Sequence, residues 1–201
     1  MKTKKIGIFG GTFDPIHLGH LAIAMEAVNE KGLDEVWFVP AGLPNFKQNK
    51  KLTDKADRLA MVELAIEGND KFKVFDYEVK SDQVSYTYKT LDYIKQNYEG
   101  DFYLIVGEDS LMSIESWEKA ETFLSNTKIL VCSRNINSQR NIDKEIKRLK
   151  EKDYRVEKIS FRNIDISSTF IRDRIREGFD VRYYLDNKVY RYIRDRGLYE
   201  D

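Results

Sequence analysis

The sequence predicts an α/β protein with one doubly wound parallel sheet, and two observations predict this fold class. Short apolar runs that do not alternate with polar residues recur along the chain, as expected for parallel strands buried on both faces. Between these runs lie segments with apolar side chains at helical spacing. Strands that alternate with helices form a doubly wound sheet, whose ligands bind at the carboxyl ends of the strands. We expect a single domain, residues 1–201, with a small helical part at its carboxyl end.

The first strand, residues 6–9, runs directly into Gly10 and Gly11. Two glycines allow a sharp turn and the close approach of a ligand, because neither has a Cβ. Asp14 then suits the N-cap, and Pro15 the first position, of a helix that extends to about residue 31. Strand, glycine turn and helix N-terminus together predict a phosphate site.

The only two histidines of the chain, His17 and His20, lie at the start of this helix. They are three positions apart, so both imidazoles leave the same face of the opening turn. Unpaired N–H groups and the positive end of the helix dipole at this place suit a phosphate. Two histidines at this spacing would alternatively be half of a zinc site, with Cys132 as the one thiol of the chain. The glycine turn favours phosphate.

The rest of the chain continues the alternation of strands and helices. A strand at 35–39 leads into a loop at 40–51, which is either a solvated loop or a substrate-facing one. The second interpretation arises because the loop leaves the carboxyl end of a strand, on the same side of the sheet as the glycine turn. A strand at 101–107 ends at Gly107, and Asp109 follows two residues later. The other expected strands are 72–75, 127–133 and 154–161, and the expected helices are 54–67, one opened by 85–87, one ending near 124, 142–152, one ending at 178, and 186–196.

A second polar cluster opens the helix that ends at 178. Ser167, Ser168 and Thr169 precede and enter this helix, so they offer hydroxyl and N–H donors to a phosphate. Arg172, one turn further on, reaches the same oxygens as a fixed cation. The alternative for this stretch is an ordinary N-cap followed by an exposed arginine.

The composition of the chain is that of a globular protein with a sizeable core. Lys+Arg and Asp+Glu both number 34, so no overall charge points to nucleic acid. No apolar run approaches the ~20 residues of a membrane span. The single cysteine excludes a disulfide framework within the chain. We expect a cytoplasmic protein without nucleic-acid or membrane partners, for which a homo-oligomer is a possible state.

Two stretches resemble the signatures of one superfamily. The run GGTFDPIHLGH is similar to the His-x-Gly-His signature of nucleotidyltransferases with an α/β fold, and ISSTFIR, residues 166–172, is similar to their second signature. The dinucleotide fingerprint G-x-G-x-x-G is not found in the sequence. Within the superfamily the chain resembles bacterial nicotinate-nucleotide adenylyltransferases over nearly its whole length.

The resemblance implies a Rossmann-like nucleotidyltransferase fold and an enzyme of NAD biosynthesis. Such an enzyme transfers the adenylyl group of ATP to nicotinate mononucleotide and releases pyrophosphate. The attacking phosphate is already ionised at neutral pH, so catalysis is positioning and electrostatics. Mg²⁺ would come with ATP, held mainly by phosphate oxygens and not by a protein cage.

The resemblance also implies a role for individual residues, with helices of about 167–198 completing the ATP site. His17, His20 and Arg172 would be catalytic. ATP would contact Gly10, Gly11, Thr12, Phe13, His17, His20, Gly107, Asp109, Arg134, Ile166, Ser167 and Arg172. Nicotinate mononucleotide would contact Thr12, Lys47, Ser85, Tyr86, Thr87 and Trp117, with Trp117 stacking on the ring.

Two departures from the family pattern leave the acceptor open. Asn45-Phe46 stands where relatives have Pro-His before a lysine, and Glu118 follows Trp117 where relatives have an aromatic residue or a histidine. A carboxylate at that place would repel an acidic substrate unless it turns away, so nicotinamide remains an alternative to nicotinate. A pantetheine-phosphate adenylyltransferase, a cytidylyltransferase and a nucleotide-binding sensor without turnover are the competing functions.

Overall fold

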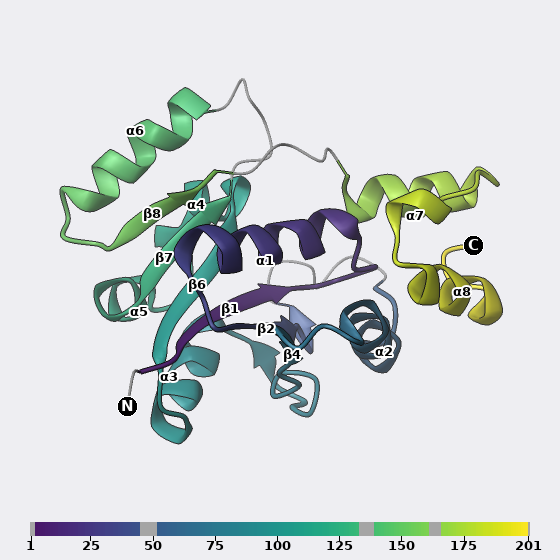
Figure 1. Ribbon diagram of the computed structural model, residues 1–201, viewed down its shortest axis with the longest axis horizontal. Coiled ribbons are helices and arrows are strands. Elements are labelled where there is room, and N and C mark those ends of the chain that lie inside the picture. The colour runs from purple at the N-terminus through teal and green to yellow at the C-terminus, as the bar shows by residue number, and fades with distance from the viewer. Residues whose placement is uncertain (1–2, 45–51, 133–138, 161–165, 201) are drawn as a thin grey trace.

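The computed structural model describes residues 3–44, 52–132, 139–160 and 166–200. Its centre is a six-stranded sheet with the strand order β4-β2-β1-β6-β7-β8, in which each neighbouring pair is parallel (Figure 1). The strands are β1 (Lys5–Gly11), β2 (Glu35–Pro40), β4 (Phe72–Val74), β6 (Asp101–Gly107), β7 (Lys128–Cys132) and β8 (Val156–Ile159). This arrangement confirms the predicted doubly wound parallel sheet.

The strand order reverses between β1 and β6. The chain proceeds from β1 to β2 and β4 in one direction, and from β6 to β7 and β8 in the other. The segments that leave these two central strands at their carboxyl ends therefore diverge, and the crevice between them is the usual ligand site of such a sheet. Strand β1 ends at Gly11, so the first signature stretch, which begins at Gly10, lies at this crevice.

Helices cover both faces of the sheet, and neighbouring residues of one strand belong to different cores. Phe9 packs in the core formed with α1, α2, α7 and α8, whereas Ile8 packs in the core formed with α3, α4, α5 and α6. Both faces are thus buried, which explains the absence of alternation. The helices are α1 (Leu18–Lys31), α2 (Lys55–Ile66), α3 (Thr87–Asn97), α4 (Glu108–Ser113), α5 (Ala120–Asn126), α6 (Gln139–Lys150), α7 (Ser168–Arg176) and α8 (Asn187–Arg196).

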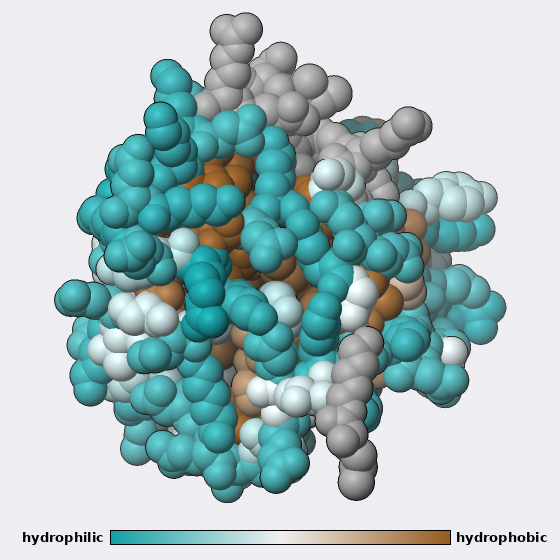
Figure 2. All heavy atoms as spheres, turned by 60° about the vertical axis from the view of Figure 1, so that its left-hand side comes forward, coloured by the Kyte–Doolittle hydropathy of each residue, from teal (hydrophilic) through white to brown (hydrophobic). Residues whose placement is uncertain are grey.

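The carboxyl-terminal helices α7 and α8 lie beyond the carboxyl end of β1 (Figure 1). Ile171 of α7 and Val189 of α8 are buried in the same core cluster as Phe9. A view from another side shows hydrophilic residues over most of the surface, with hydrophobic atoms visible mainly in recesses between them (Figure 2). The prediction of one domain for residues 1–201 is not tested by these contacts and stays a prediction.

The start of α1 differs from the prediction. Strand β1 runs through Gly10 and Gly11, neither of which has a positive φ, and the backbone turns only at Phe13 with a φ of 49°. His17, and not Asp14, is the N-cap of α1. Asp14 and Pro15 form a turn before the helix, and the Asp14 side chain is buried and accepts a hydrogen bond from Tyr199.

Other boundaries were predicted to within a few residues, but several short elements were missed. Tyr86 is the N-cap of α3, so Thr87 is already helical. The missed elements are α4, the two-stranded pair β3 (Leu43–Pro44) and β5 (Val84–Ser85), and the 3-10 helices Ile114–Ser116 and Arg182–Tyr184. In the part of the chain that the structure describes, no helix has the length and apolar character that a membrane span requires.

Candidate active site

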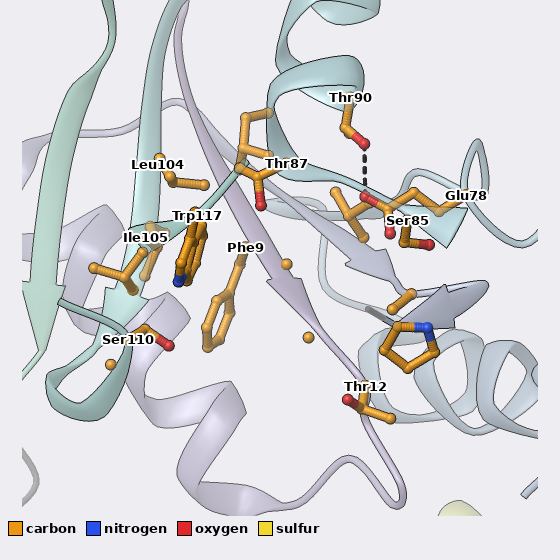
Figure 3. Close-up of a pocket in the computed structure, with 18 of the residues that line it drawn as sticks. Phe9, Thr12, Glu78, Ser85, Thr87, Thr90, Leu104, Ile105, Ser110 and Trp117 are labelled. Carbon is orange, nitrogen blue, oxygen red and sulfur yellow. Dashed lines mark hydrogen bonds between the residues drawn. The ribbon is translucent and has the colours of Figure 1, made fainter. Parts of the chain in front are cut away.

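A pocket of about 690 Å³ lies at the crevice between β1 and β6 (Figure 3). Its walls come from the end of β1, the exit of β2, the first turn of α3, the segment from β6 into α4, and Trp117. Nine residues that the sequence predicted for substrate binding line it, namely Gly10, Gly11, Thr12, His20, Ser85, Thr87, Gly107, Asp109 and Trp117.

The end of β1 leaves main chain exposed to the pocket. Gly10 is exposed, and a Cβ built on it would meet no atom within 4 Å. A ligand can therefore approach the backbone closely at this residue, because glycine has no Cβ in the way. The side chain of Thr12 follows on the same wall (Figure 3).

The two imidazoles lie together at the start of α1. Their ring centroids are 3.7 Å apart with the ring planes 29° from parallel, and the main-chain N–H of His17 donates to Nδ1 of His20 over 3.2 Å. Because Nδ1 of His20 accepts, a neutral His20 has its proton on Nε2 and is a donor at that atom. His20 lines the pocket, whereas His17 is buried and does not.

Helix α7 is bonded directly to the segment that precedes α1. The Arg172 guanidinium donates from Nη1 to the carbonyl oxygen of Asp14 over 2.6 Å, and the Ser168 hydroxyl donates to the carbonyl oxygen of Pro15 over 2.9 Å. Ser167 accepts from the N–H of Phe170 and so caps α7. Arg172 and Asp14 are 158 positions apart in the sequence, so their hydrogen bond brings the two signature stretches together at one place.

The wall formed by α3 and by the segment before it combines hydroxyl groups with one carboxyl group. The Thr90 hydroxyl donates to Oε1 of Glu78 over 2.6 Å, and Ser85 and Thr87 lie beside them (Figure 3). Burial raises the pKa of the Glu78 carboxyl, against the opposing effect of hydrogen bonds from Thr90 and Ser85 and of the Arg58 charge. Thr90 and Ser85 already donate their single hydroxyl protons to Glu78, so the Thr87 hydroxyl is the side-chain donor that this wall offers to a polar ligand, next to a carboxyl group that resists ionisation.

The opposite wall is apolar and aromatic. Trp117, Phe9, Leu104 and Ile105 all line the pocket, and the Trp117 indole is its large aromatic surface on this side (Figure 3). Trp117 also packs against Phe123, with the ring centroids 6.2 Å apart. Glu118 is exposed and is not among the described residues that line the pocket. Its carboxylate therefore does not form part of the wall that would meet an acidic ring.

The chain has close relatives among known proteins. Residues 8–174 match the family model described as Cytidylyltransferase-like. Over 200 residues the chain is 43% identical to a probable nicotinate-nucleotide adenylyltransferase of Clostridium botulinum, covering 98% of this chain and 99% of the relative. The chain belongs to the nicotinate-nucleotide adenylyltransferase family. A probable member from Clostridium tetani is 42% identical with the same coverage.

A solved structure agrees with this family. The nicotinic acid mononucleotide adenylyltransferase of Plasmodium falciparum, complexed with NaAD, has a TM-score of 0.76 and 25% identity, with 98% of each chain covered. The predicted Rossmann-like nucleotidyltransferase fold and the predicted class of enzyme, a nucleotidyltransferase of NAD biosynthesis, are thereby confirmed.

Several family site residues expected from the sequence do not line the pocket. Phe13 and Ile166 are buried in the core, and the Tyr86 ring lies 5.9 Å from that of Tyr88. The lining also excludes His17, Ser167 and Arg172, of which Ser167 caps α7 and Arg172 is bonded to Asp14. Lys47 and Arg134, with the departures Asn45 and Phe46, lie outside the described residues.

Sequence reasoning missed four residues at or behind the pocket. Glu78 and Thr90 line it, and Arg58 and Tyr199 are bonded to the segment that follows β1. Arg58 had a recognisable signal, because it lies four positions before Val62 on the apolar face of α2. Glu78 stands in a stretch without periodicity, so no pattern in the sequence indicated it. No three His, Cys, Asp or Glu side chains of the described residues lie close enough together to hold a metal ion.

Proposed function

We propose that the pocket between β1 and β6 binds ATP and nicotinate mononucleotide, and that adenylyl transfer takes place there. The observation that carries this assignment is the pair of hydrogen bonds from α7 to the carbonyls of Asp14 and Pro15, at 2.6 and 2.9 Å. They bring the second signature against the first, beside the part of β1 that lines the pocket. A cradle of donors from two distant segments is what a triphosphate requires.

In the proposed reaction an ionised phosphate oxygen of nicotinate mononucleotide attacks the α-phosphorus of ATP. A new P–O bond forms as the bond between the α-phosphorus and its bridging oxygen breaks, and pyrophosphate leaves with both electrons. No general base is needed, so the protein has to position two anions and stabilise developing charge. His20 would donate from Nε2 to a phosphoryl oxygen, with His17 fixing its orientation through the hydrogen bond to Nδ1.

The remaining roles in the ATP half of the site follow the family signatures. Gly10, Gly11 and Thr12 would contact the phosphates, and Gly107 and Asp109 would contact the nucleoside part of ATP from the other side of the crevice. Arg172 would supply a fixed positive charge near the phosphates. Phe13, Ile166, Ser167 and Arg134 stay predictions for this half.

The acceptor would lie between the aromatic wall and the wall of α3. Its pyridine ring would stack on Trp117, and its carboxylate would receive hydrogen bonds from the first turn of α3, which begins at Thr87. The outward position of Glu118 supports an acidic ring, because the feature that argued against nicotinate is not in the wall. Lys47, Ser85 and Tyr86 stay predictions for the acceptor.

Magnesium is proposed as the companion of ATP. It would be held mainly by phosphate oxygens, and Thr12, which is proposed to lie at the phosphates, offers a hard oxygen atom in the pocket lining. Bound Mg²⁺ supplies charge neutralisation on the phosphates.

The cytoplasmic location and the homo-oligomeric state, both raised by the sequence, stay predictions.

The test is release of pyrophosphate by the purified protein with ATP and Mg²⁺. Nicotinate mononucleotide, nicotinamide mononucleotide and phosphopantetheine are compared as acceptors at equal concentration. We expect nicotinate mononucleotide to give the highest kcat/KM. A higher value with nicotinamide mononucleotide would overturn the acceptor assignment, and ATP binding without pyrophosphate from any acceptor would indicate a sensor.

A further inference from the structure

Arg58 of α2 is a charged side chain buried deep in the protein, with 1% of its surface exposed. Among the described residues its guanidinium donates three hydrogen bonds, all to main-chain carbonyl oxygens. Nε donates to Thr53 over 3.1 Å, Nη1 to Thr12 over 2.7 Å and Nη2 to Gly42 over 2.9 Å. A buried guanidinium is expensive to desolvate, so its place is set by what those three bonds hold together.

Thr12 lies in one wall of the pocket, and Gly42 lies within the segment that forms another. Thr12 follows β1 and lines the pocket directly. Gly42 follows β2, and its neighbours Ala41 and Pro44 line the pocket. Arg58 thus joins, from outside the cavity, the wall proposed for the phosphates and the wall formed by Ala41 and Pro44 after β2.

Gly42 is held so closely that a side chain at this position would require the main chain to shift. Its N–H donates to Oγ of Ser85 over 3.0 Å, and a Cβ built on it would lie 2.1 Å from the carbonyl oxygen of Glu78. Ala41 is bonded in turn through its N–H to the carbonyl of Gly11 over 2.9 Å. The position of Gly42 is therefore determined from three sides, by α2, by β5 and by the end of β1.

A lysine cannot take the place of Arg58. Its single ammonium group cannot reach three carbonyls on three segments, whereas the planar guanidinium presents donors in several fixed directions. Burial lowers the pKa of Arg58 from its ordinary value, and the negative charge of Asp14 is the largest opposing effect. The guanidinium nevertheless remains protonated over the accessible pH range.

We propose that Arg58 is a positioning residue, which sets the separation of the Thr12 wall from the Gly42 wall and thereby aligns ATP with the acceptor. This inference rests on the proposed function. Arg58 touches no substrate atom, so its effect is on alignment, and misplacement by about 1 Å costs on the order of 10²-fold in rate.

The experiment compares wild type with Arg58→Lys, and uses Arg148→Lys as the control. Arg148 forms ion pairs with Glu115 and Glu145 on the surface of the other core, outside the pocket lining. For each protein, kcat and both KM values are measured at 25 °C, together with ATP affinity by calorimetry and the thermal unfolding midpoint. We expect Arg58→Lys to lose on the order of 10²-fold in kcat/KM for both substrates, and Arg148→Lys to leave the kinetics unchanged.

A merely structural role gives a different result. Arg58→Lys would then unfold at a lower temperature but keep the kcat and KM values of wild type at 25 °C, which would overturn the proposal. If wild type itself releases no pyrophosphate, the proposed function fails, whereas an active wild type with the same kcat/KM values as Arg58→Lys would overturn the role of Arg58 alone.

A second variant decides the case if Arg58→Lys does not fold. Gly42→Ala keeps Arg58 but forces the chain away from the carbonyl of Glu78, so it should move the wall that Arg58 holds. We expect its KM for the acceptor to rise about tenfold or more while its KM for ATP changes less. Kinetics equal to those of wild type would overturn the proposal.

Discussion

The phenol of Tyr199 donates a hydrogen bond to Oδ1 of Asp14 over 2.8 Å, although 185 positions separate the two residues. Asp14 is 2% exposed, and its Oδ2 has no hydrogen-bond partner in the described part of the chain. Arg172 holds the carbonyl of the same residue. The carboxyl-terminal segment is therefore part of the structure that supports the first signature, through both a side chain and a main-chain contact of Asp14.

Removing the hydroxyl in Tyr199→Phe should destabilise the protein. Oδ1 of Asp14 would lose its donor while remaining buried, which costs about 1–3 kcal/mol. The free energy of unfolding in denaturant measures this loss. The control is Tyr183→Phe, since Tyr183 is 84% exposed and its change should stay within about 0.5 kcal/mol. Equal losses in the two variants would show that the contact with Asp14 is not stabilising.

His20→Ala should keep the fold and lose most of the turnover. The ring lines the pocket and offers Nε2 as a donor, and loss of one preorganised donor lowers kcat by about 10²- to 10³-fold. Steady-state release of pyrophosphate gives the rate, and circular dichroism checks that the helices remain. A variant with the turnover of wild type would contradict the placement of His20 at the transferred phosphate.

Trp117→Ala should weaken binding of the acceptor and leave ATP binding nearly unchanged. Loss of aromatic stacking costs about 1–3 kcal/mol, which corresponds to a rise of about tenfold or more in KM for nicotinate mononucleotide. Trp37→Phe is the control, because Trp37 is the other tryptophan of the chain and is buried against Phe75 with 5.3 Å between the ring centroids. This control should lower the unfolding midpoint without changing KM. Equal KM values in Trp117→Ala and wild type would exclude the stacking role.

The sequence predicted the sheet better than it predicted the segments around the site, for a physical reason. Burial on both faces makes β1 and β6 continuously apolar, and that signal is local. The N-cap of α1 was misplaced because Asp14 is engaged by Tyr199, a contact between opposite ends of the chain. Local capping preferences give no information on such a partner.

The site shows the same division between local and long-range signals. Gly10, Thr12 and His20 were found because their motif is contiguous. Arg58 and Glu78 were missed because their partners, Gly42 and Thr90, become neighbours only when the chain folds. A charged residue on the apolar face of a helix, as at Arg58, is the kind of local inconsistency that can mark such a contact.

The pH dependence of stability tests the environment of Glu78. Its pKa in the folded protein is raised by burial, above the ordinary value of about 4.3 in an unfolded chain. Between these two values the folded protein binds more protons than the unfolded one, so stability falls as the pH rises. Glu78→Gln cannot ionise and lacks this loss. We therefore expect its free energy of unfolding, relative to wild type, to increase as the pH rises above the ordinary value of about 4.3.

Glu115→Gln is the control with the opposite sign. Hydrogen bonds from Lys152 and Arg148 lower the pKa of the Glu115 carboxyl, so the ionised form stabilises the folded protein and this contribution is lost as the pH falls. Wild type should therefore gain stability over Glu115→Gln as the pH rises, whereas it loses stability relative to Glu78→Gln. Denaturant unfolding at each pH measures both differences. If the difference for Glu78→Gln shrank with rising pH, the hydrogen bonds from Thr90 and Ser85 would outweigh burial, and the carboxyl group in the α3 wall would be a charge that the acceptor meets.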